Sequence, residues 1–363
     1  MNSDMEMTAD ETAVSLRNLS FGFGRGSKST VLGSRIDASL KYGELACVVG
    51  PVGGGKSLLA KTVVGLQPCF DGDVFLGRRR VGDCSKAELS RHVAYFSSES
   101  ASNGNISVAD YIVYGHKPVW PFRRKMSEKD NNAVSRCLDW LGIGDFGNRK
   151  IRTLSRAERD KVILAKAIFS DVPVILLDGL LDSLSFPDNV EVLCLLRRMA
   201  HTSKKAVAVL MSNAELAVQF ADRIWSVDKN RGFNSGIPED LFLRGVVDEC
   251  FGNERISYDI STGRFVYSGD HIRSVIVEGD VAGKEYTAVC RALGRCAVDV
   301  ETPETASGSS VLKVVVKGNG RFCLHHPDAS EENFTSVEHL LTALLSAMSK
   351  LRISLLSEES PEP

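Results

Sequence analysis

The sequence predicts an α/β protein with a parallel sheet at its centre, followed by a second, smaller α/β domain. Three observations carry this prediction. Apolar strands alternate with helical segments, a glycine-rich loop follows one strand, and the hydrophobic period changes near residue 270. Strands that alternate with helices are typical of parallel sheets, because each helix returns the chain to the same edge. A length of 363 residues fits two or three domains.

The chain opens with antiparallel strands expected within residues 13–49, where the short runs Val14–Leu16 and Ser20–Phe23 are separated by other residues. The next expected elements are a helix, a hairpin, a small helix and a strand, at about 56–66, 72–81, 85–90 and 93–96. From about 105 to 147 the apolar spacing becomes helical, with a break at Trp120-Pro121-Phe122.

A strand–helix pattern fills the rest of the first domain. The run Val172–Leu177 is fully apolar and ends at Asp178, as expected for a strand buried on both faces. The other expected elements are a helix from about 155, a helix at 188–201, a strand at 206–211, a helix ending at 221 and a strand at 224–227. Residues 230–237 are rich in turn formers and predict a boundary.

Residues 271–350 are expected to form the small C-terminal α/β domain, joined through Ser268-Gly269-Asp270. Its expected elements are strands at 272–277, 297–300, 311–316 and 322–324, and helices at 285–293 and from 337 to about 348. This domain has no catalytic motif, so regulation or dimer contact is the expected use. Residues 1–12 and 351–363 are polar or acidic and are predicted to be flexible.

Composition narrows the functional classes. A net charge of −2 provides no general attraction to nucleic acid or anionic lipid. The nine cysteines are scattered without a C-x-x-C spacing, which is typical of free thiols in a reducing compartment. The N-terminus is acidic, unlike a signal peptide, and the apolar runs are shorter than the roughly 20 residues of a membrane helix. The sequence therefore predicts a cytoplasmic protein that meets a membrane only through a partner.

One motif for nucleotide chemistry is complete. The segment Gly50-Pro51-Val52-Gly53-Gly54-Gly55-Lys56-Ser57 fits G-x-x-x-x-G-K-[ST], between an apolar strand and a helix that starts near Leu58. Glycines allow backbone N–H groups to surround phosphate oxygens at a helix N-terminus, whose dipole favours anions. Lys56 is expected to reach the β- and γ-phosphates, and Ser57 to hold Mg²⁺. The motif predicts binding of a nucleoside triphosphate.

A family resemblance extends this interpretation to about residues 12–268. The order of P-loop, helical insert (about 100–157), Leu154-Ser155-…-Glu158-Arg159 and an apolar strand ending in Asp178 resembles ABC-transporter ATP-binding subunits. The stretches Leu138–Ile143, Ala221–Lys229 and Gly236–Phe242 are similar to importers of iron(III)-siderophores, haem and cobalamin. The resemblance implies a P-loop ABC ATPase core with an antiparallel β subdomain.

The resemblance also implies ligands and partners. The cofactors are ATP and Mg²⁺, with adenine stacked on Phe23, phosphates held by residues 50–58 including Leu58, and Mg²⁺ held by Ser57 and Asp178. The implied protein partners are a membrane permease and a second nucleotide-binding subunit, either identical or an intact paralogue. This places the chain at the inner face of the cell membrane, peripheral to it through the permease.

Several positions leave the family pattern. The glutamate that polarises the attacking water is replaced by Gly179, the aspartate of the following loop by Ser185, and the histidine after the next strand by Ser212. The glutamine that touches Mg²⁺ is replaced by Ser98 or Glu99, depending on register. Glu99, Asp182 and Glu215 are in no position that offers an obvious replacement. Since a general base contributes about 10²–10⁴ in rate, hydrolysis is expected to be severely impaired.

The segment that should face the partner's γ-phosphate is also changed. It reads Leu154-Ser155-Arg156-Ala157-Glu158, where the family has Leu-Ser-Gly-Gly. Ser155 is retained, but two side chains stand where backbone must approach phosphate. Two functions are therefore consistent with the chain: a motor subunit of an ABC importer that binds ATP, or a non-hydrolysing regulatory or scaffold protein derived from one.

Two further groups carry weaker signals. His325 and His326 lie near Cys323 but lack a second ligand cluster with metal-site spacing, so metal is the less favoured interpretation. Arg123-Arg124-Lys125 lies in the insert and is expected to be a solvated face.

Overall fold

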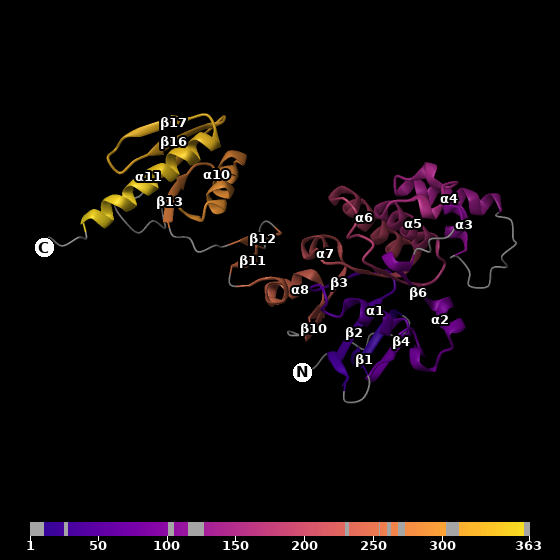
Figure 1. Cartoon of the computed structure of the whole chain (residues 1–363). Helices are drawn as coiled ribbons and strands as arrows, with labels where there is room; N and C mark the ends of the chain where they lie inside the picture. Colours follow the sequence, from indigo (N-terminus) through magenta and orange to yellow (C-terminus); the bar gives the residue numbers. More distant parts are fainter. Residues whose placement is uncertain are drawn as a thin grey trace. The chain divides into compact units, whose positions relative to one another are not determined.

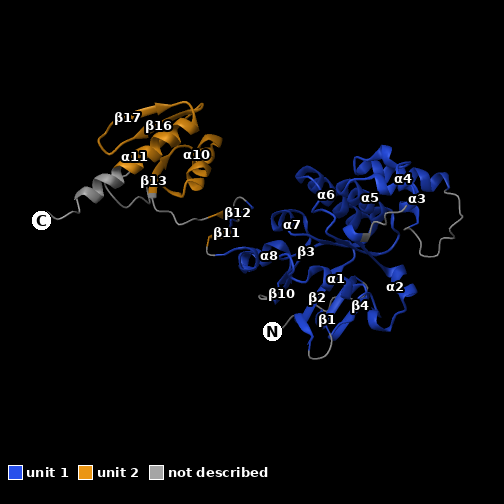
Figure 2. Ribbon diagram, viewed as in Figure 1, with its two compact units in different colours: residues 1–253, 258–265 blue, residues 254–257, 266–363 orange. Residues whose placement is uncertain are grey.

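The computed structural model describes residues 11–24, 28–100, 105–114, 127–228, 232–253, 255–259, 263–267, 273–302 and 312–358. The chain forms two compact units, one of residues 1–253 and 258–265 and the other of residues 254–257 and 266–363 (Figure 2). The following sequence predictions lie outside the described residues: Trp120-Pro121-Phe122, Arg123-Arg124-Lys125, Ser268-Gly269-Asp270, and residues 1–10 and 359–363 of the two expected flexible ends.

An antiparallel sheet opens the first unit, with strand order β2-β1-β4-β5 (Figure 1). Its strands are β1 (Thr12–Phe23), β2 (Thr30–Lys41), β4 (Asp71–Leu76) and β5 (Arg79–Arg80). The two short runs expected at 14–16 and 20–23 belong to the single strand β1. The pairing of β1 with β2 shifts register between Leu16 and Leu19, so the strand passes the irregular stretch without ending.

A six-stranded sheet follows, with strand order β10-β9-β3-β8-β7-β6. Its strands are β3 (Leu45–Val49), β6 (Val93–Ser97), β7 (Val174–Asp178), β8 (Ala206–Leu210), β9 (Arg223–Asp228) and β10 (Gly232–Gly236). All neighbours except β9 and β10 pair in parallel, as the sequence predicted. The carboxyl ends of β3, β6, β7 and β8 therefore meet at one edge, where the loops that follow them gather.

Side chains of the parallel strands alternate between two cores, because successive residues of a strand point to opposite faces. The helices around the sheet are α1 (Lys56–Val63), α2 (Lys86–His92), α3 (Val108–Val113), α4 (Glu128–Trp140), α5 (Arg156–Phe169), α6 (Phe186–Ser203) and α7 (Ala214–Phe220). Ile175 and Leu177 pack with α3 to α7. Val174 and Leu176 pack with α1 and the antiparallel sheet.

The turn-rich boundary expected at 230–237 is wrong over its described part. Residues 232–236 form β10, which pairs antiparallel with β9, and Phe233 packs edge-on against Trp225 at 6.0 Å between ring centroids. The two glycines of this strand, Gly232 and Gly236, stand at its ends and not in its interior, so the glycine content misled the prediction. The elements that follow are α8 (Pro238–Leu243), α9 (Val246–Phe251), β11 (Ile256–Asp259) and β12 (Arg264–Tyr267).

The second unit contains a five-stranded sheet with order β14-β13-β15-β16-β17. Its elements are β13 (Arg273–Glu278), α10 (Lys284–Arg295), β14 (Val298–Glu301), β15 (Lys313–Gly318), β16 (Arg321–His325), β17 (Glu331–Phe334) and α11 (Val337–Glu358). Helices α10 and α11 contact each other and share one core with alternate residues of the sheet, including Val314 and Leu324.

Helix α11 is longer than expected. The sequence analysis predicted that this helix ends at about residue 348 and that 351–363 form a flexible tail. In the structure, residues 351–358 continue the helix. No glycine or proline interrupts the chain between 337 and Pro361, so the backbone has no stop signal before that point. Strand β17 was not expected, because its sequence Glu331-Glu332-Asn333-Phe334 is mostly polar.

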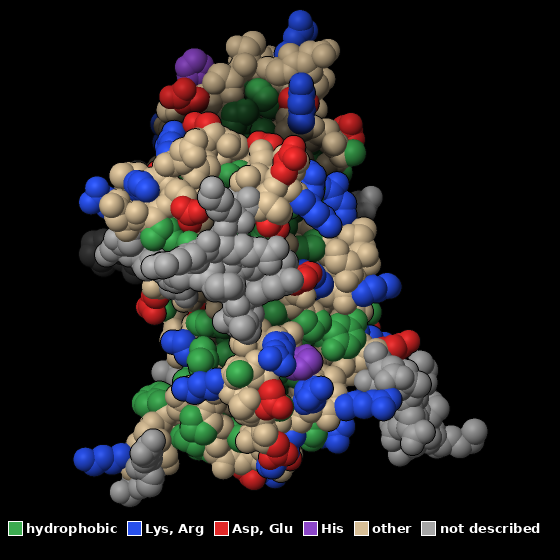
Figure 3. Space-filling model, turned by 90° about the vertical axis from the view of Figure 1, so that its right-hand side faces the viewer, with side chains coloured by type: hydrophobic (Ala, Val, Ile, Leu, Met, Phe, Trp, Pro, Cys, Tyr) green, Lys and Arg blue, Asp and Glu red, His purple; other side chains and the backbone are tan. Residues whose placement is uncertain are grey.

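Acidic, basic and hydrophobic side chains are interspersed on the face of the molecule drawn in Figure 3, in keeping with the net charge of −2. Among the described residues, no helix combines the length and the apolar character needed to cross a membrane.

Candidate nucleotide-binding site

The P-loop lies between β3 and α1, where the sequence placed it. Gly50 follows the strand with φ +150°, and a side chain there would place its Cβ 2.1 Å from the carbonyl oxygen of Val227. Gly55 precedes the first helical residue with φ +103°. Only glycine satisfies both positions without strain, so the loop can bring its backbone N–H groups to one point at the start of α1.

A cavity of about 440 Å³ lies over this loop. It brings together most of the residues expected to bind nucleotide: Phe23, Val52, Gly53, Gly54, Gly55, Lys56, Ser57, Leu58 and Asp178. Two of the three degenerate positions, Gly179 and Ser212, also line it, together with Asp182. Gly50, Pro51, Ser185 and residues 154–158 are not among its lining residues. Phe23 is 52% exposed, so its ring is available as a stacking surface.

Lys56 folds back onto the loop. Its Nζ donates to the carbonyl oxygens of Gly50 at 2.7 Å and of Pro51 at 3.0 Å. Burial lowers the pKa of Lys56, while the nearby carboxylates of Asp182 and Asp178 oppose that shift. The ammonium group therefore sits partly desolvated beside the cavity, where an anion would be a stronger partner than neutral carbonyls.

Asp178, at the end of β7, has an unexpected partner on the neighbouring strand. The Tyr95 hydroxyl of β6 donates to Asp178 Oδ2 at 2.5 Å. Burial, and then the Asp178 carboxylate, raise the pKa of Tyr95, so its proton stays in place at neutral pH. The sequence analysis missed this pair. Only the pairing of β6 with β7 brings these two residues close together. The two parallel strands pair Tyr95 with Leu176 and Ser97 with Asp178.

Position 179 offers no acidic group. Gly179 has φ +67°, in the left-handed region, and a Cβ there would lie 3.7 Å from Asp182 Oδ2. There is room for a side chain, but the backbone conformation favours glycine. Asp182 is a carboxylate beside this position that lines the cavity, and Ser212 stands exposed at its β8 side.

Ser98 and Glu99 are the two candidates for the position of the family's glutamine, and neither lines the cavity. Ser98 Oγ donates to Asp160 Oδ1 at 2.8 Å, and Ser183 Oγ donates to Asp160 Oδ2 at 2.6 Å. Asp160 belongs to α5 and is 1% exposed. This carboxylate therefore ties the loops after β6 and β7 to one helix. The sequence analysis missed it, because Asp160 falls within a helix whose apolar face accounted for the pattern.

The changed segment 154–158 begins α5. Ser155 caps the helix by accepting from the backbone N–H of Glu158, whose side chain accepts in return from the backbone N–H of Ser155 at 2.7 Å. Arg156 is 68% exposed, with its Nε 3.9 Å from Asp160 Oδ2. Ser185 has a similar role, since it caps α6 through the backbone N–H of Asp188.

The Glu215 carboxylate binds a backbone N–H group outside the cavity. Its Oε1 accepts from the backbone N–H of Phe265 at 2.9 Å, so the carboxylate is used to hold a strand. Glu99 is exposed and is not among the residues that line the cavity.

Comparison with known proteins supports the interpretation of the first unit. Residues 33–181 match the family described as ABC transporter. An uncharacterized ABC transporter ATP-binding protein of Methanocaldococcus jannaschii is 25% identical over 257 residues, covering 71% of this chain and 87% of that protein. The petrobactin import ATP-binding protein FpuD of Bacillus anthracis is 24% identical, covering 69% and 90%. The cobalamin import ATP-binding protein BtuD of Halobacterium salinarum is 28% identical, covering 63% and 57%.

Solved structures show the same fold. A dimeric ATP-binding cassette in a post-hydrolysis state, bound to ADP and phosphate, has a TM-score of 0.55 at 21% identity, covering 62% of this chain and 98% of that one. CbiO1 from Clostridium perfringens, part of the ABC transporter complex CbiONQ, has a TM-score of 0.55 at 18% identity, covering 66% and 94%. The expectation of a P-loop ABC ATPase core is confirmed.

Proposed function

We propose that this chain, whose residues 33–181 match the family described as ABC transporter, is the ATP-binding subunit of an importer of the siderophore or cobalamin type. In this proposal ATP binding is retained and hydrolysis is severely impaired. The observation that carries it is a single cavity that is lined by residues 52–57 of a complete P-loop motif and has no carboxylate at position 179.

The residues present fit a nucleotide with Mg²⁺. The loop is open to a phosphate at Gly53, since a Cβ at this position would meet nothing within 4 Å. Lys56 would exchange its two carbonyl partners for phosphate oxygens, and Phe23 would stack on the base. Ser57 and Asp178 supply the hydroxyl and carboxylate oxygens that a hard cation prefers. The cation would neutralise phosphate charge, while the chain orients the nucleotide.

Impaired hydrolysis is proposed from two residues that line the cavity, Gly179 and Ser212, and from Tyr95, which contacts the cavity residue Asp178. Gly179 cannot accept a proton from water, and Ser212 has no ring nitrogen to contact a γ-phosphate. Tyr95 already occupies one oxygen of Asp178. A missing general base alone costs about 10²–10⁴ in rate.

The proposed partners are a separate permease in the cell membrane and a second nucleotide-binding subunit that faces the P-loop. The permease would hold this chain at the inner surface of that membrane. The names of the relatives, which include petrobactin and cobalamin import ATP-binding proteins, support the importer type.

The second candidate function is a regulatory or scaffold protein that binds nucleotide without turning it over. The exposed Arg156 favours it, because a charged side chain now starts the helix where close backbone approach is expected. The two candidates differ in assembly. An importer subunit co-purifies with a permease, and a scaffold of the second kind does not.

The direct experiment measures MgATP binding and phosphate release on the same preparation of the full chain. We expect saturable binding, with phosphate release no faster than from the Lys56→Ala variant. Absence of binding at millimolar MgATP would overturn the nucleotide-binding proposal. Phosphate release at rates ordinary for transporters, abolished by Lys56→Ala, would overturn impaired hydrolysis.

A further inference from the structure

The second unit brings together a thiol, an imidazole and a carboxylate from two neighbouring strands. Cys323 and His325 lie two residues apart on β16, so their side chains share one face of the strand. Glu331, on β17, is the cross-strand partner of His325. Among the described residues, this is the group of three whose sulfur, imidazole and carboxylate atoms all lie within 4.8 Å of one another.

From this arrangement we propose that Cys323, His325 and Glu331 form a binding site for a borderline-soft divalent cation, with Zn²⁺ as its ligand. The site shares no residue with the nucleotide cavity and does not depend on the function proposed above. Thiolate, imidazole and carboxylate are the three ligand types that Zn²⁺ takes from proteins. Harder ions such as Mg²⁺ prefer oxygen alone and would not select a thiolate.

The distances fit a tetrahedral ion. His325 Nδ1 lies 3.2 Å from Glu331 Oε1, and Cys323 Sγ lies 3.8 Å from Glu331 Oε2. Around Zn²⁺ with ordinary bond lengths, the nitrogen–oxygen edge is about 3.3 Å and the sulfur–oxygen edge about 3.6 Å. The two edges use different carboxylate oxygens, so Glu331 would rotate to bring one oxygen into both.

The surroundings provide a route for the ion. Cys323 is fully buried. The exposed fraction of the side chain is 32% for His325 and 51% for Glu331. The donors therefore run from the interior to the surface. Lys313, the other cross-strand neighbour of His325, pairs its ammonium with Glu278, which offsets its charge. When Zn²⁺ binds, the Cys323 thiol proton leaves to solvent and a fourth position stays open.

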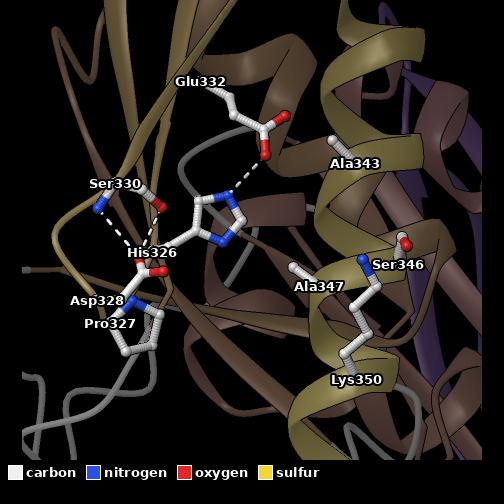
Figure 4. Close-up of a pocket in the computed structure, with 9 residues that line it drawn as sticks. All are labelled: His326, Pro327, Asp328, Ser330, Glu332, Ala343, Ser346, Ala347 and Lys350. Atoms are coloured by element: carbon white, nitrogen blue, oxygen red, sulfur yellow. Dashed lines mark hydrogen bonds and ion pairs between the residues drawn. The ribbon is translucent and has the colours of Figure 1, made fainter.

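The adjacent residue supplies a matched control. His326, one residue past the end of β16, pairs its Nε2 with Glu332 Oε1 of β17 at 3.0 Å. This second pair faces a different cavity, of about 660 Å³, which is lined by Ala343, Ala347 and Lys350 of α11 (Figure 4). It reproduces the histidine–glutamate chemistry without a cysteine. If metal binding needs the thiol, a change at His325 weakens it and the same change at His326 does not.

The experiment uses the full chain, metal-stripped and kept reduced, in a Cys69→Ser, Cys194→Ser background that removes the two exposed thiols. Zn²⁺ is titrated in competition with a chromophoric chelator, and Co²⁺ is used as a spectroscopic probe. We expect one Zn²⁺ per chain and a thiolate-to-cobalt charge-transfer band. Cys323→Ser should abolish the band, and His325→Gln or Glu331→Gln should weaken binding at least about tenfold. His326→Gln should change neither readout.

Three outcomes would overturn the site: no stoichiometric Zn²⁺, binding that survives Cys323→Ser and His325→Gln together, or equal loss in His326→Gln. Circular dichroism of each variant checks that the fold is intact. If Cys323→Ser fails to fold, His325→Gln, whose side chain is partly exposed, decides the question alone.

Discussion

The hydroxyl of Tyr95 donates a 2.5 Å hydrogen bond to Asp178 Oδ2, so the carboxylate at the end of β7 has a partner on the strand beside it. A carboxylate accepts through only two oxygens, and Mg²⁺ binds those same oxygens. The tyrosine therefore competes, at one of these two oxygens, with the cation that the P-loop region is expected to use.

Tyr95→Phe should tighten the binding of Mg²⁺ in the presence of ATP. Removing a hydrogen bond to a charged group, worth about 1.5 kcal/mol, frees the carboxylate and should lower the apparent Kd for Mg²⁺ about tenfold. Titration of Mg²⁺ at fixed ATP with a fluorescent nucleotide measures this shift. Tyr42→Phe, a partly buried tyrosine that does not line the cavity, is the control. Unchanged or weaker Mg²⁺ binding in Tyr95→Phe contradicts the competition.

Lys56→Ala should remove most of the stabilisation that MgATP gives to the wild type. A ligand at 100 times its Kd raises the free energy of unfolding by about 2.7 kcal/mol, which is readily seen in a melting curve. Lys86→Ala, an exposed lysine on α2, should leave that shift intact. If millimolar MgATP fails to move the wild-type transition, the P-loop does not bind nucleotide.

Gly179→Glu alone should restore almost no hydrolysis. Residue 179 has φ +67°, so any side chain there costs about 1–2 kcal/mol of backbone strain or shifts the loop. The other degenerate positions would also remain unchanged, and groups that act as one unit do not contribute separately. Phosphate release, measured with the proposed membrane partner present, tests this. High activity in the single variant would show that the other positions matter little.

The combined variant Gly179→Glu, Ser212→His, Arg156→Gly, Ala157→Gly should recover measurable turnover. It restores the base, the switch position and the backbone approach at the start of α5. Its control is the same protein carrying Lys56→Ala, which should be inactive. If turnover stays absent while MgATP still binds, the loss lies elsewhere, and Tyr95 is the first residue to change.

A chain truncated after Gly269 should be soluble and should still bind ATP. The residues that line the cavity all precede position 213, and the second unit has a hydrophobic core of its own. Nucleotide affinity should stay within about twofold of the full chain. Precipitation of the truncated chain, or loss of binding with an intact circular dichroism spectrum, contradicts an independent first unit.

Much of the fold could be predicted because its signals are local. The run from Val174 to Leu177 is apolar on both faces, and the P-loop has a fixed spacing. The errors come from elements whose cause lies in a partner strand. Strand β10 exists because β9 offers it an edge, and β17 because it pairs with β16. Neither carries an apolar pattern of its own.

In the candidate site, too, residues with a local sequence signal were predicted and residues that depend on a spatial neighbour were not. Most of the loop residues, together with Asp178, were placed from sequence and line one cavity. Tyr95 and Asp160 were missed, because their importance depends on which strand and which loop lie next to them in space. Glu331 was missed for the same reason, since it reaches Cys323 and His325 only through strand pairing.

The carboxylate of Asp160 has a mechanical consequence. It is buried and accepts from Ser98 and Ser183, while its own helix starts at the segment expected to face a second subunit. A displacement of either loop must break one of these bonds or carry α5 along. Breaking one leaves a buried charge short of a donor, at a cost of about 1–3 kcal/mol. A joint movement avoids this cost, so Asp160 couples the loops after β6 and β7 to the start of α5.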